Sequence, residues 1–289
     1  MVRSNKDRFA VPEQDPGPPV PAEQTPEVAA PGTEHQNPSS MLQFIVPTEV
    51  VDLPSKGIFY GEAHPLHNCE TIEIRHMTAK EEDILTSTTL LKKGMALDKM
   101  LQSVIVNKDI KVEDLLLGDK NALLVHSRVY GYGPNYSTAI VCPACGESFE
   151  NNFDLTAIGN KELDLQLDKY GIESTDRRTF LIELPKSKYN VEFRLLTSRD
   201  ETAALGSAKE MKSLKLLETI TVSLNDQADR FYIKRALSSL PIIDASILKR
   251  AYAAATPDIN LTQEAHCPHC AEISEVGVPL DAGFFWPEL

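Results

Sequence analysis

The sequence lacks the long apolar runs and the positive charge that would favour a membrane or nucleic acid as partner. No run approaches the roughly 20 apolar residues that cross a bilayer, and the first residues contain no apolar signal-peptide stretch, so export by that route is not expected. Asp and Glu number 42 against 29 Lys and Arg, a formal net charge of −13. Because so acidic a surface repels phosphates and anionic lipids, we expect neither nucleic acid nor a membrane as the main partner.

Motifs of the common catalytic sites are also missing. The glycine cluster at residues 130–136 has no Lys-Ser or Lys-Thr after it, unlike a P-loop, and is interpreted as a turn that enters a strand. Neither a Gly-x-Ser-x-Gly elbow nor a His-Glu-x-x-His motif occurs. The acidic pairs Glu81-Glu82 and Asp200-Glu201 fall in predicted first turns of helices, where they complement the helix dipole. The sequence therefore predicts a protein that is not an enzyme.

The chain has 289 residues, of which 42% are hydrophobic, enough for a core in one or two domains. Residues 1–40 differ from the rest, because they hold eight prolines among polar residues and almost no large apolar side chains. Such a segment cannot bury enough apolar surface to offset its ordering entropy. We therefore predict a disordered proline-rich tail followed by a folded region.

The folded region begins with strand and helix signals. In residues 71–75, Ile72 and Ile74 alternate with polar residues, which is typical of a half-buried strand. Thr78 and Glu81 have the spacing of a capping box, so a helix should follow. Apolar residues at helical spacing continue through a second stretch, for which Asp119 is the predicted N-cap, and a strand-like segment at 136–141 leads to a cysteine pair.

Several short segments occur twice in the same order. Residues 72–83, IEIRHMTAKEED, match residues 191–202, VEFRLLTSRDET, at an offset of 191 − 72 = 119. Asp119 matches Asp244 at an offset of 244 − 119 = 125, and two Cys-Pro-x-Cys turns keep that offset, since 267 − 142 = 125. We infer an α+β fold of two internally duplicated strand-helix-strand repeats, residues 41–158 and 159–289, with about six extra residues in the second.

Four of the five cysteines belong to these turns: Cys142, Cys145, Cys267 and Cys270. Zinc in structural sites takes four ligands, and two such turns supply that number. We therefore predict one structural Zn²⁺ in a zinc ribbon-like site shared by both repeats, with no open position for catalysis. A redox-active cysteine pair and an iron–sulfur cluster are the alternatives. His266 and His269 flank the second turn and could replace a ligand.

Cys69 is the cysteine left over, interpreted as a half-buried thiol, with a second metal site beside His64 and His67 as the alternative. The chain ends with Phe284, Phe285 and its only tryptophan, Trp286. Termini are usually frayed and polar. These aromatic residues are therefore predicted either to dock into the protein's own core or to bind a partner, for which such side chains are favoured.

Three motifs in this order carry a resemblance to a known family. They are LLLGDKNALLVHSRVYGYGPNY at residues 115–136, the CPxCG turn that follows, and VPLDAGFFWPEL after the second CPxC. The chain resembles the T4-type bacteriophage baseplate hub assembly chaperone family over about residues 42–289.

The resemblance implies a bacteriophage protein made for virion assembly, whose partners are baseplate hub or tail proteins of a contractile tail. It implies action in the host bacterial cytoplasm, with a place in the virion tail baseplate as the alternative. A zinc-ribbon protein that binds nucleic acid or a polymerase is the competing function, although the acidic charge argues against direct binding to nucleic acid.

Overall fold

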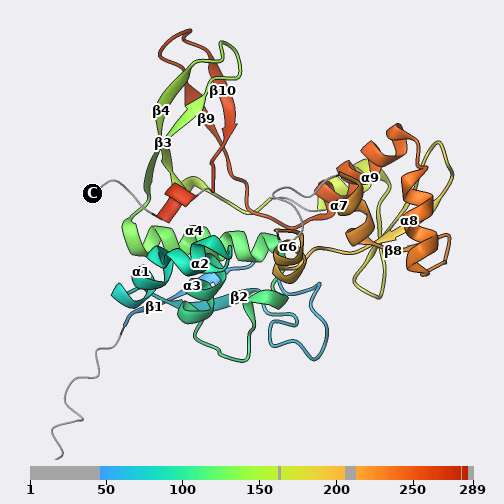
Figure 1. Ribbon diagram of the computed structural model, residues 1–289, viewed down its shortest axis with the longest axis horizontal. Helices are drawn as coiled ribbons and strands as arrows, with labels where there is room; N and C mark the ends of the chain where they lie inside the picture. Colours follow the sequence, from blue (N-terminus) through green and yellow to red (C-terminus); the bar gives the residue numbers. More distant parts are fainter. Residues whose placement is uncertain (1–45, 162–163, 206–212, 281, 286–289) are drawn as a thin grey trace, which may run out of the picture. The chain divides into compact units, whose positions relative to one another are not determined.

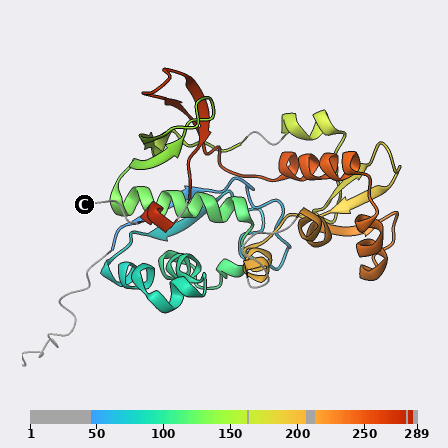
Figure 2. The same ribbon diagram turned by 45° about the horizontal axis from the view of Figure 1, so that its top comes forward.

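A computed structural model describes residues 46–161, 164–205, 213–280 and 282–285, and the predicted proline-rich tail of residues 1–40 lies outside them. Helices are combined with small antiparallel sheets (Figures 1 and 2), so the predicted α+β class is confirmed. Among the helices in these ranges, none is long and apolar enough to span a bilayer.

The first half, residues 46–158, consists of a strand pair, helices and a β-hairpin. Its elements are β1 (Thr48–Asp52), β2 (Thr71–Arg75), α1 (Ala79–Thr86), α2 (Thr88–Lys92), α3 (Ala96–Val104), η2 (Val112–Asp114), α4 (Leu117–Tyr132), β3 (Asn135–Val141), β4 (Ser148–Asp154) and the short helix η3 (Leu155–Ala157). β1 and β2 are antiparallel, and Val51 lies opposite Ile72 with both side chains buried. The alternation predicted for residues 71–75 is therefore observed.

The second half, residues 159–289, contains a four-stranded antiparallel sheet in the order β5-β6-β7-β8. Its elements are α5 (Asp164–Tyr170), β5 (Glu173–Ser174), β6 (Phe180–Glu183), β7 (Asn190–Phe193), α6 (Ser198–Leu205), α7 (Ser213–Ile220), β8 (Thr221–Leu224), α8 (Arg230–Ser238), α9 (Ile242–Ala255), β9 (Thr262–His266), β10 (Ile273–Gly277) and η4 (Ala282–Phe285). Phe180 and Phe193, on neighbouring strands, stack at 5.4 Å in the core.

Part of the element order of the first half recurs in the second, which also has α5, β5 and β8. β1-β2 corresponds to β6-β7, α4 to α9, and the hairpin β3-β4 to β9-β10. In both halves a Leu-Pro pair ends the first strand, and a lysine just after it, Lys56 or Lys188, has a positive φ of 50° or 58°. The boundary between residues 158 and 159 stays a prediction.

Asp119 is fully buried at the third position of α4. Its carboxylate accepts hydrogen bonds from the main-chain nitrogen of Ser55 at 3.0 Å, from the Ser55 hydroxyl at 2.6 Å and from the Tyr60 hydroxyl at 2.7 Å. The prediction that Asp119 is an N-cap is wrong, because α4 begins earlier, at Leu117. The side chain instead holds the turn that follows β1.

Asp244 makes the equivalent contact in the second half. It is also fully buried at the third position of its helix, α9. Its carboxylate accepts the main-chain N–H groups of Lys186 at 3.0 Å and Ser187 at 2.7 Å, in the turn that follows β6. In each half, a buried aspartate at the third position of the long helix therefore holds the turn that follows the first strand of the pair.

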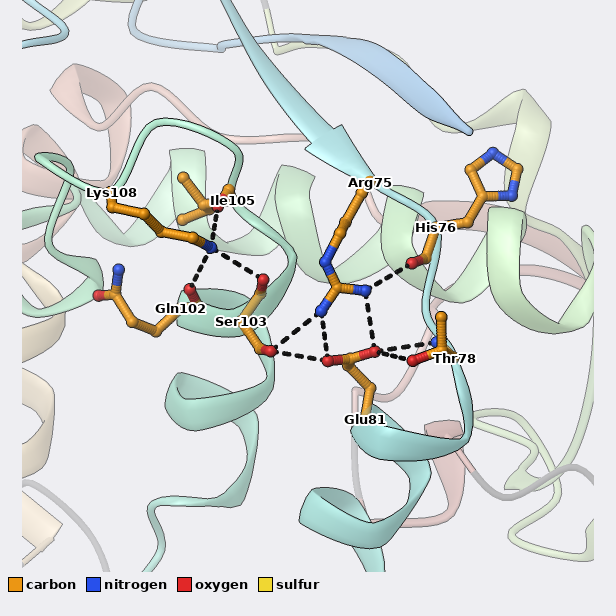
Figure 3. A network of polar contacts seen from close by, with 8 residues as sticks. All are labelled: Arg75, His76, Thr78, Glu81, Gln102, Ser103, Ile105 and Lys108. Atoms are coloured by element: carbon orange, nitrogen blue, oxygen red, sulfur yellow. Dashed lines mark hydrogen bonds and ion pairs between the residues drawn. The ribbon is translucent and has the colours of Figure 1, made fainter. Parts of the chain in front are cut away.

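The predicted capping box of α1 is confirmed and belongs to a larger network (Figure 3). Glu81 is buried and accepts two hydrogen bonds from Arg75, at 3.0 and 2.6 Å, and further ones from Thr78 and Ser103. Lys108 donates to main-chain oxygens at the end of α3, which satisfies carbonyls that a helix end leaves free. The network joins β2, α1 and α3.

A matching network exists in the second half. Asp200 accepts two hydrogen bonds from Arg194, both at 2.8 Å, and one from the main-chain nitrogen of Thr197 at 2.9 Å. Glu81 and Asp200 thus neutralise a strand arginine and cap a helix at once. Because both carboxylates are engaged in these hydrogen bonds, the structure agrees with the prediction that the acidic pairs stabilise helix starts.

Replacing Glu81 with glutamine should destabilise the protein strongly. The substitution leaves the Arg75 guanidinium without its buried counter-charge, a change that typically costs about 3–5 kcal/mol of unfolding free energy. Urea denaturation of wild type and Glu81→Gln at pH 7 measures the loss. Glu82→Gln is the control, because Glu82 is exposed on the same helix turn and its substitution should stay within about 0.5 kcal/mol.

The difference in unfolding free energy between wild type and Glu81→Gln should depend on pH. Burial raises the pKa of Glu81, but the hydrogen bonds from Arg75, Ser103 and Thr78 outweigh it and lower that pKa to about 2. Since the folded value lies below the ordinary 4.5, the stabilisation is full above that pH and is lost as pH falls towards 2. An unchanged stability gap between wild type and Glu81→Gln across this range would contradict the assignment.

Candidate metal centre

The two Cys-Pro-x-Cys turns lie at the tips of hairpins β3-β4 and β9-β10, which stand side by side in both views (Figures 1 and 2). In the first hairpin Val141 pairs with Ser148, and in the second His266 pairs with Ile273, directly before and after each turn. Gln263 of β9 donates a hydrogen bond of 2.7 Å to the main-chain oxygen of Asp154, at the end of β4. The hairpins therefore contact each other at their bases as well as at the tips.

The turns have the same local geometry. The main-chain nitrogen of Cys142 donates to the oxygen of Glu147 at 2.9 Å, and that of Cys267 donates to Glu272 at 3.0 Å. The residue after each second cysteine, Gly146 or the equivalent Ala271, donates back to the oxygen of the first cysteine at 2.9 Å. Both residues have a positive φ, a conformation that is easiest for glycine and that Ala271 adopts at φ 59°.

The four sulfur atoms converge, as predicted from the sequence. All four lie within 4.8 Å of one another, and among the residues described they are the single group of this kind. The short contacts run between the hairpins: Cys142 to Cys270 and Cys145 to Cys267, both 3.7 Å between sulfurs. Four sulfurs placed tetrahedrally at about 2.3 Å from one metal ion are separated by roughly 3.8 Å. The observed spacing therefore fits one tetrahedral metal ion.

The electrostatics of the site favour a thiolate at one position. Main-chain amides of Cys145 and Ala144 lower the pKa of the Cys142 thiol to about 7, against the opposing effect of desolvation. At Cys270, the Glu272 amide lowers the pKa, but desolvation and the neighbouring cysteines raise it to about 12. Four thiols this close cannot all lose their protons without a cation, and a bound metal ion would supply the required charge.

The geometry also bears on the alternatives. A thioredoxin-type redox pair needs only the two cysteines of one turn, whereas here each cysteine also has a sulfur contact of 3.7 Å in the other hairpin, which gives a cluster of four. His266 and His269 are exposed and do not belong to the cluster. Cys69 is half-buried and its sulfur lies 3.5 Å from the main-chain oxygen of Pro65, so it is a separate thiol. The iron–sulfur alternative stays open.

Sequence analysis missed the importance of Arg128. This α4 residue is 1% exposed, and its guanidinium donates to the main-chain oxygens of Phe284 at 2.8 Å, Gly133 at 2.8 Å and Asn135 at 3.2 Å. It therefore links the foot of the first hairpin to η4, which follows the second hairpin. An arginine at helical spacing carries no signal that separates this role from a solvated surface position.

Phe284 and Phe285 lie in the core, each only 2% exposed. The Phe284 ring meets that of Tyr136 edge-on, with 5.0 Å between ring centres. Of the two roles predicted for these phenylalanines, docking into the protein's own core agrees with their burial. Trp286 lies outside the described residues, so its partner-binding role stays a prediction.

Replacing Cys267 with serine should remove the metal. Metal binding and folding are coupled when the ligands come from distant parts of a chain, so we expect the metal content to fall from one ion per chain and the melting temperature to drop. Elemental analysis and thermal unfolding of the purified full chain measure both. Cys69→Ser is the matched control, since it removes a cysteine outside the cluster, and equal metal content and melting of Cys267→Ser and wild type would contradict a shared site.

Comparison with known proteins adds a family. A family model described as T4 bacteriophage base plate protein matches residues 47–286. No curated protein matches the chain, and neither does a solved structure.

Proposed function

The chain belongs to the T4 bacteriophage base plate protein family, and from this premise we propose that it helps to build the central hub of the tail baseplate. Its role in the baseplate is structural, and it acts through contacts with hub or tail proteins. Within that role it is either a transient assembly factor or a component that stays in the hub. The family match over residues 47–286 is the observation that carries the proposal.

We propose further that the four cysteines hold one structural Zn²⁺. The support is the set of four sulfur ligands with short contacts of 3.7 Å between two hairpins. A site closed by four thiolates has no position for a substrate or for water, so its contribution is mechanical. The ion would join two hairpins that are far apart along the chain, and thereby keep the surfaces of the two halves in register for a partner.

Copy counting by quantitative mass spectrometry separates the two roles. Purified phage particles are compared with the lysate of infected cells, and the chain is counted relative to known tail proteins. A small fixed number of copies per particle identifies a hub component. Presence in the lysate, bound to hub or tail proteins, with none in particles, identifies an assembly chaperone. A chain that copurifies with no tail protein in either sample would contradict the proposed function.

Trp286 is the predicted partner anchor, and two single substitutions separate it from the core. Phe284→Ala should lower the unfolding free energy by about 3–5 kcal/mol, because it empties a buried aromatic site. Trp286→Ala should leave the melting temperature nearly unchanged but weaken capture of hub proteins from infected lysate, measured by pull-down with the full chain. Wild-type capture by Trp286→Ala would exclude the anchor role.

A zinc-ribbon protein that binds nucleic acid or a polymerase is the competing function, because paired hairpins with cysteine turns also occur in such proteins. The formal charge of −13 opposes contact with phosphates. Binding to DNA that weakens steeply as salt is added would favour this alternative over the baseplate role.

A further inference from the structure

The two halves contact each other through the start of α4. Residues 115–117 form a β-bridge with residues 196–198, the connection between β7 and α6. The main-chain nitrogen of Leu117 donates to Leu196 at 3.2 Å, and that of Ser198 donates to Leu115 at 2.8 Å. Lys120, itself buried, adds an ion pair of 2.7 Å with the more exposed Glu201. We call this the α4 contact.

The internal repeat supplies a second copy of both surfaces. By the offset of 125, residues 115–117 correspond to residues 240–242 at the start of α9 (115 + 125 = 240). By the offset of 119, residues 196–198 correspond to residues 77–79, between β2 and α1 (196 − 119 = 77). Among the residues described, no bridge joins 240–242 to 77–79. Among these residues the α4 contact is therefore made once, and Thr78, Ala79 and Ile242 of the equivalent surfaces are exposed.

The open helix start is apolar. Ile242 is 89% exposed and Ile243 56%, whereas their equivalents at the start of α4, Leu117 and Gly118, are half-buried and buried. Ile242 is the first residue of α9, so its main-chain N–H has no acceptor within the helix. Exposing two isoleucine side chains to water costs free energy, which a partner that covers them would recover.

The backbone at residues 240–242 and 77–79 already resembles that of their equivalents in the α4 contact, residues 115–117 and 196–198. The residue before α9, Pro241, has φ −53° and ψ 140°, nearly the values of Leu116 before α4, φ −63° and ψ 146°. On the other side, the Glu81 carboxylate holds Thr78 as Asp200 holds Thr197, through main-chain N–H bonds of 2.9 Å. Docking would therefore require little rearrangement of either surface.

We propose that a second copy of this chain covers the start of α9 with its residues 77–79, which repeats the α4 contact between molecules. The main-chain nitrogen of Ile242 would donate to Met77 of the next copy, and that of Ala79 would donate to Leu240. Such a head-to-tail contact uses different surfaces on the two molecules, so it grows into a ring if the rotation closes and into a filament if it does not.

Two sequence differences from the α4 contact determine how polar the association between copies is. Ala245 corresponds to Lys120 (120 + 125 = 245), so the contact between copies lacks an equivalent of the ion pair with Glu201. Ile243 corresponds to Gly118, where a side chain would collide with the oxygen of Pro257. The association is therefore more open and more apolar than the α4 contact, and added salt should not weaken it.

Two substitutions test the two surfaces separately. Ile242→Glu places a charge at the apolar helix start, on a side chain whose exposure makes it harmless to folding. Ala79→Pro removes the proposed donor at the first position of α1, where proline is well tolerated and where the preceding Thr78 is already extended at φ −125° and ψ 176°. Phe231→Glu is the control, because Phe231 is 76% exposed on α8 outside the proposed contact.

Sedimentation velocity over a concentration series of the full chain measures association. Wild type and Phe231→Glu should associate. Ile242→Glu and Ala79→Pro should each raise the protein concentration at which half of the chains are associated by more than about tenfold. An equal mixture of the last two should form dimers and nothing larger, because each variant keeps one intact surface. A monomeric wild type at every concentration would overturn the proposal, as would association of Ala79→Pro equal to wild type.

Discussion

Convergence of four sulfur atoms from two distant hairpins is the constraint on which the rest of the structure depends. Cys142 and Cys270 come from hairpins separated by more than a hundred residues, yet their sulfurs are 3.7 Å apart. Closing so long a loop costs conformational entropy, and unbound thiolates at this distance repel one another. One metal ion bound to all four sulfurs, as proposed, would offset both costs and hold the two hairpins together.

The inferred internal duplication would explain how one chain arrives at two half-sites. Each half fastens its first turn to its long helix by a buried aspartate, Asp119 or Asp244, and caps its next helix through an arginine-bound carboxylate. The same kinds of local contact therefore stabilise both halves. The halves then differ where they meet, since Lys120 and Gly118 are suited to the α4 contact and their counterparts Ala245 and Ile243 are not. The two halves of the chain are thus similar in fold but differ in the surfaces with which they make contacts.

Features defined by local spacing could be predicted from the sequence. The alternation of Ile72 and Ile74, the Thr78–Glu81 capping box and the cysteine spacing each depend on a few neighbouring residues, and all appear in the structure. Asp119 was misassigned because an acidic residue near a helix start resembles an N-cap, and only its distant partner Ser55 reveals its role. Arg128 and the buried Phe284 could not be assigned for the same reason, since their partners lie far away in the sequence.

X-ray absorption spectroscopy at the metal edge of the purified full chain tests the central claim most directly. The account predicts a zinc edge with four sulfur neighbours at about 2.3 Å and no second metal nearby. Nitrogen or oxygen neighbours in place of sulfur, or an iron edge with a metal–metal distance, would contradict the shared four-cysteine zinc site.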